Sequence, residues 1–183
     1  MLRGINVGSH KRMRMDALRT VYESVGLENP QTYLQSGNVV FKTLERDLTA
    51  LAKRIESGIE QHFGFPSDVI VRTSSELRSV VARNPFAARP GIDPSKLLVT
   101  FLAGDCGKEA QENLLGIKAD SEEMRVDGRE LYIYFPLGMG RSKLSPALIE
   151  KKLKLTGTGR NWNTVTNLLA IAEKLENKKF DKS

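Results

Sequence analysis

Three short segments rich in glycine, asparagine and serine are the first places in this sequence where binding or chemistry could occur. They are Leu2–Gly8 (LRGINVG), Gln35–Asn38 (QSGN) and Thr158–Thr164 (TGRNWNT). Each is polar and favours turns, and each adjoins a segment whose pattern predicts regular structure. Polar side chains on loops that a rigid scaffold positions are common in binding sites.

Cationic and neutral polar side chains in or beside these segments could hold an anionic ligand. Arginine recognises phosphate or carboxylate with two parallel hydrogen bonds, and asparagine donates and accepts without charge. Glycine permits turns whose backbone N–H groups face an anion. The predicted ligand-binding residues are Arg3, Asn6, Lys11, Ser36, Asn38, Arg160, Asn161 and Asn163.

Several of these residues also have a structural interpretation, and the sequence leaves both open. Asn161 or Asn163 can cap the last helix, and Asn38 can be a turn residue. Trp162 can stack on a nucleobase or anchor the core. Because it is the one tryptophan of the chain, we favour the role of core anchor.

Positive charge is concentrated in two stretches of the chain. The sequence carries a net charge of +6, from 28 Lys and Arg against 22 Asp and Glu. Residues 1–20 hold five basic residues against Asp16 alone, and residues 141–160 hold six against Glu150 alone. The first polar segment and part of the third lie in these stretches. A local positive field attracts phosphate groups, although the same pattern is typical of a solvated face.

Composition predicts a cytoplasmic protein and no membrane partner. Hydrophobic residues make up 40% of the 183 residues and charged residues 27%, which is typical of globular proteins. We find no apolar run long enough to span a bilayer and no secretory leader pattern. The single cysteine, Cys106, excludes an internal disulfide and suits a reducing compartment.

The residue types offer little for metal binding or catalysis. Two histidines, His10 and His62, and Cys106 are too few for a zinc site by themselves. The segment Gly138–Lys143 (GMGRSK) matches neither the phosphate-binding loop nor the dinucleotide fingerprint. No pair of carboxylates can be singled out for acid–base chemistry. We therefore expect no metal and no cofactor, and the catalytic residues, if there are any, stay unknown.

Hydrophobic periodicity and turn signals predict the elements that position the polar segments. In the first half we expect a strand at 2–6, a helix over 15–25 and a turn at Asn29-Pro30. A bulged strand or tight hairpin over 32–41 should follow, and then a helix over 48–63. The half should end with a strand over 68–73 and a short helix opened by a capping box at Thr73–Glu76. In the second half we expect a strand over 96–103, a helix over 108–115, a hairpin turning at Asp127-Gly128, a helix capped by Ser145, a loop and a terminal helix.

This order of elements resembles a ferredoxin-like (split βαβ) unit in each half, provided that residues 32–41 form a hairpin. We therefore predict an α+β fold of two ferredoxin-like (split βαβ) units in tandem. The first unit is expected over residues 1–85, a linker rich in proline over 86–95, and the second unit with its C-terminal helix over 96–183.

Taken with their neighbours, the three polar segments resemble a known family. Leu2–Gly8, Tyr33–Phe41 and Arg160–Val165 are similar to the signatures of domain of unknown function 1697. Agreement is weaker at Asn84–Phe86 and from Phe135 to Lys143. The resemblance covers nearly the whole chain and implies a bacterial cytosolic α+β protein, but no activity, because that family is uncharacterised. Family members usually carry further residues before the first segment, so we expect either a misassigned start of the sequence or a shortened first strand.

The leading functional hypothesis is a binding module for a phosphate-bearing partner, either a nucleic acid or a small phosphorylated molecule. Its basis is that basic residues and glycine–asparagine segments coincide. One alternative is a metal-independent enzyme with Arg3 and Arg160 as electrostatic clamps on a small anionic substrate. Another is a protein-interaction module with an acidic partner. A single site further requires that the loops of Asn6 and Asn38 lie side by side and that Arg160 approaches them from the second half.

Overall fold

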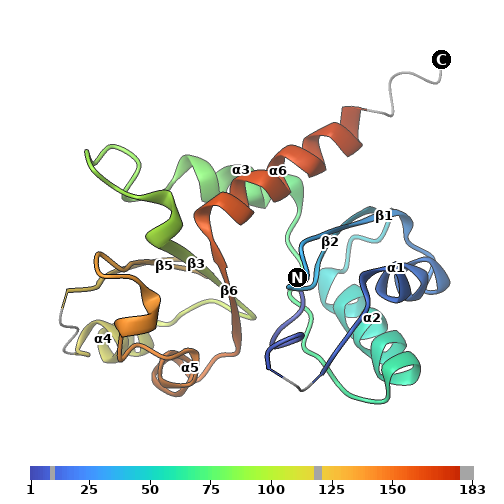
Figure 1. Ribbon diagram of the computed structural model, residues 1–183, viewed down its shortest axis with the longest axis horizontal. Coiled ribbons are helices and arrows are strands. Elements are labelled where there is room, and N and C mark those ends of the chain that lie inside the picture. The colour runs from blue at the N-terminus through green and yellow to red at the C-terminus, as the bar shows by residue number, and fades with distance from the viewer. Residues whose placement is uncertain (9–10, 118–120, 178–183) are drawn as a thin grey trace. The chain divides into compact units, whose positions relative to one another are not determined.

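The computed structural model describes residues 1–8, 11–117 and 121–177 and has the predicted α+β fold (Figure 1). Its internal contacts divide the chain into two compact units, and each is described by itself below. Unit 1 comprises Met1–Glu76 and Asn167–Ser183, and unit 2 comprises Leu77–Thr166. Within the described ranges, no helix combines the length and the apolar character needed to cross a bilayer.

Unit 1 contains a two-stranded antiparallel sheet with helices beside it. Its elements are α1 (Met15–Ser24), β1 (Glu28–Tyr33), β2 (Asn38–Lys42), α2 (Leu48–Phe63), the start of α3 (Ser74–Ala82) and the larger part of α6 (Trp162–Asn177). Helix α1 contacts both β1 and α2. Side chains at helical spacing, among them Leu18, Ile55 and Ile59, are fully buried in the core of this unit.

Residues 32–41 form a hairpin, which was one of the two expected alternatives. Tyr33 pairs with Asn38, and residues 34–37 are the connecting loop. Gly37 is required there for two reasons. Its φ of 73° is in the left-handed region, and a Cβ atom would lie 2.7 Å from Ile5 and 2.8 Å from Leu2.

Three expectations for unit 1 are wrong. Asn29-Pro30 lies inside β1 instead of making a turn, and the strand register shifts between Glu28 and Gln31. Residues 2–6 and 68–73, both expected as strands, form none. Their pairing is limited to a single bridge between Leu2 and Val69, and the backbone N–H of Val69 donates to the Glu56 carboxylate at 2.8 Å.

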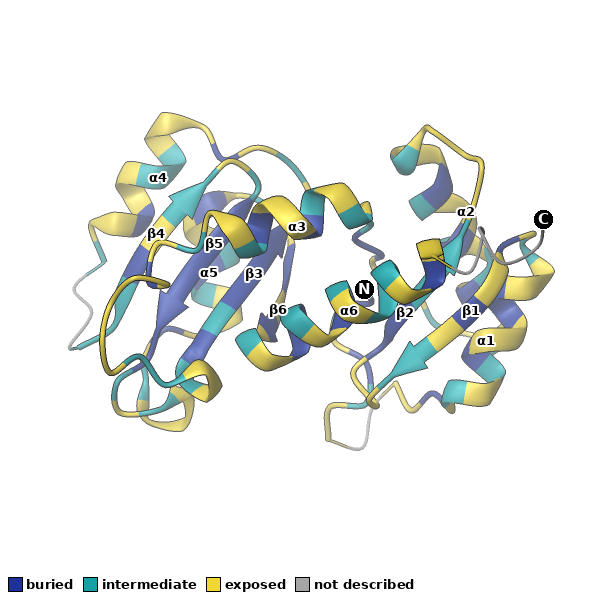
Figure 2. Cartoon of the chain, turned by 90° about the horizontal axis from the view of Figure 1, so that it is seen from above, coloured by how far each residue is buried: buried dark blue, intermediate teal, exposed yellow. Residues whose placement is uncertain are grey.

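Unit 2 is built on a four-stranded antiparallel sheet with the strand order β4-β5-β3-β6 (Figure 2). Its elements are β3 (Leu97–Leu102), α4 (Lys108–Leu115), β4 (Glu123–Asp127), β5 (Glu130–Tyr134), α5 (Pro146–Leu153), β6 (Gly157–Asn161), two short 3₁₀ helices at Pro94–Lys96 and Met139–Arg141, and parts of α3 and of α6 (Trp162–Asn177). Figure 2 shows how thoroughly β3 and β5 are buried.

One face of this sheet is covered by α4 and α5. Leu114 of α4 and Ile149 and Leu153 of α5 pack in one cluster with Leu131 and Ile133 of β5. Because β5 lies between β3 and β4, the unit β3-α4-β4 is split by a third strand. The predicted tandem of two ferredoxin-like units, by contrast, stays a prediction.

One expectation for unit 2 is also wrong. Residues 157–161 were expected in a loop and form strand β6. They pair with β3 from Leu98↔Asn161 to Leu102↔Gly157. The segment contains two glycines and no apolar alternation, so its sequence carries no strand pattern. The pairing to a buried neighbour creates the strand.

Residues 86–95, which the sequence marks as a linker, lie within unit 2 and contact its sheet. The Phe86 ring is buried 6.0 Å from the Tyr134 ring, measured between centroids. Arg89 lies over the same tyrosine ring and forms an ion pair with Glu123 at 2.6 Å. The predicted division at 1–85, 86–95 and 96–183 stays a prediction.

Candidate functional site

The three polar segments are divided between the two units. The first two lie in unit 1 and the third lies in unit 2, as far as Thr164. We call residues 3–8, Lys11 and residues 34–37 the loop edge of unit 1. Its geometry is set by a few side chains whose hydrogen bonds cross long stretches of sequence.

Asn6 joins the first segment to the second. Its amide nitrogen donates to the Gln35 carbonyl at 2.7 Å and to the Met13 carbonyl at 3.0 Å. Its amide oxygen accepts the Met13 N–H at 2.8 Å. The loops of Asn6 and Asn38 therefore lie side by side, as the single-site hypothesis requires. Because its amide group is occupied by the backbone, Asn6 positions the loops.

Asn38 fixes the hairpin loop from inside. It is completely buried, and its amide nitrogen donates to the Tyr33 carbonyl at 3.0 Å and to the Ser36 hydroxyl at 2.9 Å. Asn38 itself is the first residue of β2, and its side chain holds the turn at residues 34–37. Ser36 itself is an exposed residue of the loop edge, and its hydroxyl accepts the hydrogen bond from Asn38.

Arg3 and Lys11 are held against one short segment, Pro66–Asp68. The Arg3 guanidinium lies 3.2 Å from the Asp68 carboxylate, and the two side chains are 39% and 52% exposed. The Lys11 ammonium donates to the Pro66 carbonyl at 2.8 Å, and Ser67 donates from its hydroxyl to the Arg3 carbonyl at 3.2 Å. Both cations are thereby fixed at the same edge of unit 1.

The loop edge also concentrates unusual backbone conformations. Gly4 and Gly8 have positive φ values, and so do the non-glycine residues Asn6 (53°), Lys11 (49°) and Leu34 (59°). Asparagine tolerates this region, whereas a bulky residue such as leucine rarely adopts it. Conformations of this kind cluster at functional sites.

In unit 2, Arg160 is buried and bound to its own strand. Only 7% of the residue is exposed, and its guanidinium donates to the Thr158 hydroxyl at 2.7 Å and to the Gly159 carbonyl at 2.8 Å. Burial disfavours the charged form and lowers the pKa of Arg160 to about 10.

The two asparagines of the third segment differ in role. The Asn161 side-chain oxygen accepts the Thr164 N–H at 2.8 Å, so Asn161 is the residue that caps α6. Asn163 is exposed on the first turn of that helix, next to the half-buried Trp162. Convergence of this segment with the loop edge stays a prediction, and His10 lies outside the described residues.

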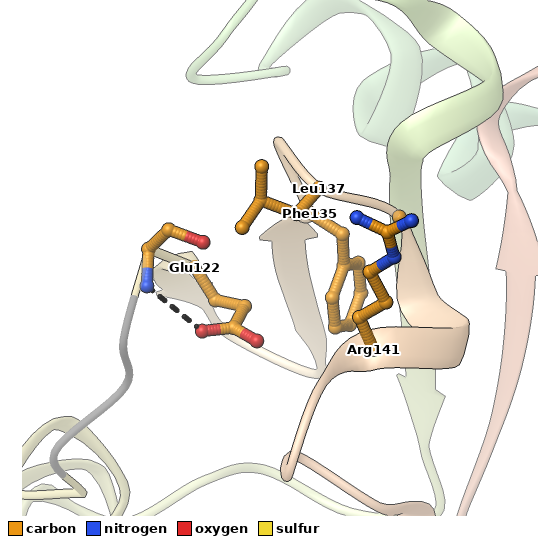
Figure 3. Close-up of a pocket in the computed structure, with 6 residues that line it drawn as sticks. Glu122, Phe135, Leu137 and Arg141 are labelled. Carbon is orange, nitrogen blue, oxygen red and sulfur yellow. Dashed lines mark hydrogen bonds between the residues drawn. The ribbon is translucent and has the colours of Figure 1, made fainter.

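A shallow pocket in unit 2 was not predicted from the sequence (Figure 3). It is lined by Ser121, Glu122, Phe135, Leu137, Gly138 and Arg141. The Phe135 ring and Leu137 lie between Glu122 and Arg141, so an apolar patch separates an anion from a cation. The sequence signal that falls on this pocket is the weaker family resemblance expected from Phe135 to Lys143, which lies beyond the residues that the family model matches. Among the described residues, no group of three His, Cys, Asp or Glu side chains could hold a metal ion.

Comparison with known proteins places the chain in a family. A search of curated proteins finds no match. The fold is similar to that of conserved bacterial protein SP0830 from Streptococcus pneumoniae, with 18% sequence identity and a TM-score of 0.67. The likeness spans 94% of this chain and 96% of that one and concerns the fold alone. The family model for proteins of unknown function (DUF1697) matches residues 1–132, and on this match the chain belongs to the DUF1697 family.

Proposed function

We propose that this protein is a binding module for a phosphate-bearing partner, which contacts the loop edge of unit 1. The observation that carries the proposal is the fixing of two cations at one edge. Arg3 and Lys11 come from different parts of the first loop, and both are bound to the segment Pro66–Asp68. Cations that are positioned before the ligand arrives lose less side-chain entropy on binding.

The surrounding charge supports the same ligand class. Residues 1–15 contain no acidic residue, and Arg12 is exposed beside Lys11. Asp68 forms an ion pair with Arg3, and the basic residues around it still outnumber the acidic ones. A positive surface of this kind attracts phosphate groups over roughly one Debye length, about 8 Å at physiological salt.

The loops around the cations add groups that suit phosphate oxygens. Ser36, Gly4 and Gly8 are exposed residues. Within the part of the chain that the structure describes, no heavy atom outside the immediate neighbours lies within 4 Å of where a Cβ atom of Gly4 or Gly8 would be. Open glycine backbone allows an anion to approach N–H groups closely. In this proposal Asn6 and Asn38 hold the loops, and Arg3, Lys11 and Ser36 contact the ligand.

The proposal is tested by measuring the binding of labelled DNA, RNA and inorganic polyphosphate at two salt concentrations. Binding should weaken steeply with salt, because neutralised phosphates release counterions. The double variant Arg3→Gln with Lys11→Asn should bind more weakly and lower the salt slope by about one for each lost contact. Asparagine is chosen at position 11 because it tolerates the left-handed backbone there.

A matched control removes the same charge elsewhere in unit 1. Lys53 and Arg54 are exposed on α2, and the variant Lys53→Gln with Arg54→Gln lowers the net charge equally. The control should retain the binding and salt slope of the unaltered protein. If both variants lose affinity equally, binding depends on the net charge of the protein and not on Arg3 and Lys11. If the unaltered protein binds no polyanion at low salt, the proposal is refuted.

A further inference from the structure

Both loops of the loop edge present a large apolar side chain to solvent. Val7 is 69% exposed and Leu34 is 56% exposed. They are sequence neighbours of Asn6 and Gln35, whose side-chain-to-backbone hydrogen bond of 2.7 Å joins the two loops. Single exposed leucines are ordinary on protein surfaces. An apolar residue on each side of a fixed junction is a more specific arrangement.

Leu34 is the more informative of the two because of its backbone. Its φ of 59° is one that hairpin loops usually give to glycine or asparagine, which adopt it without strain. Leucine gains little packing in return there, since more than half of its surface is exposed. Strain without a packing reason points to a contact that the free chain does not make.

The residues that carry the two cations belong to the same loop edge as these apolar side chains. The Lys11 carbonyl accepts the Asn6 N–H at 3.1 Å, so Lys11 adjoins the same junction. The Arg3 carbonyl is bonded by Ser67, next to the proline that Lys11 binds. A ligand that matches this edge therefore carries both anionic groups and apolar surface.

We infer that the loop edge binds single-stranded nucleic acid, with phosphates at Arg3 and Lys11 and an unstacked base against Val7 and Leu34. This inference rests on the proposed function and names its partner. In a duplex the faces of the bases are stacked on one another, so Val7 and Leu34 would have nothing apolar to contact. A single strand exposes those faces. A small inorganic phosphate has no apolar surface at all.

The test compares a labelled single-stranded oligonucleotide with the same strand annealed into a duplex. The variant Val7→Ser with Leu34→Asn keeps the charge and suits the backbone of both loops. The unaltered protein should bind the single strand about tenfold more tightly than the duplex, and the variant should lose about that factor for the single strand only. Its affinity for duplex and its salt slope should stay the same.

Leu44→Ser is the matched control, because Leu44 is 90% exposed in unit 1 outside the loop edge. It should leave all binding unchanged. If the double variant does not fold, Val7→Ser alone is measured, because it changes one exposed loop position. It should lose part of the preference for single-stranded over duplex DNA.

Three results would overturn the inference. Equal binding of both DNA forms, unaffected by Val7→Ser, would refute it and leave the proposed function standing. Binding to phosphatidylserine vesicles that depends on Val7 and Leu34, without any effect on oligonucleotides, would assign the apolar pair to a lipid surface. Absence of binding to any polyanion would refute this inference together with the proposed function.

Discussion

Two buried tyrosines in this chain differ in what their hydroxyl groups meet. The Tyr132 hydroxyl donates to the Val80 carbonyl at 2.9 Å. The Tyr22 hydroxyl is fully buried in unit 1 and has no hydrogen-bond partner among the described residues. Burial also raises the pKa of both phenols, so both stay neutral. A buried donor without a partner destabilises the fold by its desolvation.

Tyr22→Phe should therefore raise the free energy of unfolding by about 1 kcal/mol, because it removes the unsatisfied hydroxyl and keeps the ring. The ring retains its edge-on contact with Phe41, at 5.4 Å between centroids. Urea denaturation measures the change. Tyr132→Phe is the paired control and should lower the free energy by about the same amount, since it breaks a hydrogen bond. A loss of stability in Tyr22→Phe would show that its hydroxyl has a partner.

Asp16, at the start of α1, gives a prediction for pH. Hydrogen bonds from Arg14, at 2.6 Å and 3.1 Å, and from the Ala17 N–H lower the pKa of its carboxyl from 3.8 to about 2. Because the pKa of Asp16 is lower in the folded protein, its ionised carboxyl stabilises the fold at any pH above the ordinary pKa of 3.8. This stabilisation is lost as the pH falls through about 2. An NMR titration of the carboxyl carbon should show this midpoint.

Arg14→Gln should raise the pKa of Asp16 only part of the way, because the Ala17 N–H still donates. Asp93 serves as an internal control, since the pKa of its carboxyl is lowered mainly by hydrogen bonds from Ser95, which the substitution does not touch. An Asp16 midpoint near 3.8 in the unaltered protein would contradict the ion pair.

At the scale of elements, β6 shows how an edge strand is protected. It is the last strand of its sheet, with β3 on one side. On the other side, the Glu150 carboxylate accepts the Gly157 N–H at 3.1 Å, and the Arg160 guanidinium binds the Gly159 carbonyl at 2.8 Å. Side chains thus satisfy backbone groups that another chain could pair with.

Glu150→Ala should expose the edge of β6, lower the free energy of unfolding by about 1 kcal/mol and increase self-association. Light scattering over a range of protein concentrations measures the association. Glu150→Gln is the control, because its amide oxygen can still accept the Gly157 N–H. If both variants stay as monomeric as the unaltered protein, the side chain of Glu150 does not protect the edge.

The sequence predicts elements well where local signals suffice. The helix at 48–63 was predicted with the bounds of α2, and the Ser145 cap and the Thr73–Glu76 capping box are both formed. Strand β6 could not be predicted, because its pattern depends on pairing with β3. The strand expected at 68–73 is also absent, and its backbone pairing with the first residues is limited to the bridge between Leu2 and Val69.

For the candidate site, the sequence indicates the segments but not the roles of their side chains. Asn6 and Asn38 were expected to contact a ligand, and both have their amide nitrogens bonded to backbone carbonyls. The binding of Lys11 at Pro66 spans 55 residues of sequence, a contact that no local pattern encodes. Only the fold determines which polar side chains remain at the surface.

At the scale of the whole molecule, the three polar segments are divided between two units. Arg3 belongs to unit 1 and Arg160 to unit 2, although the sequence suggested that both hold one ligand. Their surroundings differ, because the Arg3 side chain is 39% exposed and the Arg160 residue only 7% exposed. Polar segments of similar composition thus contain a cation at a surface and a cation inside a sheet.

Arg160→Ala distinguishes a structural role from a shared site. Burial and the bonds to Thr158 and Gly159 predict a loss of roughly 2 kcal/mol in the free energy of unfolding, with no change in the dissociation constant for polyanions. Urea denaturation and binding at low salt are measured on the same protein, with Arg3→Gln as the comparison. If Arg160→Ala weakens binding as much as Arg3→Gln does, the two segments act on one ligand. If stability alone falls, the third segment maintains the sheet of unit 2, and binding belongs to the loop edge.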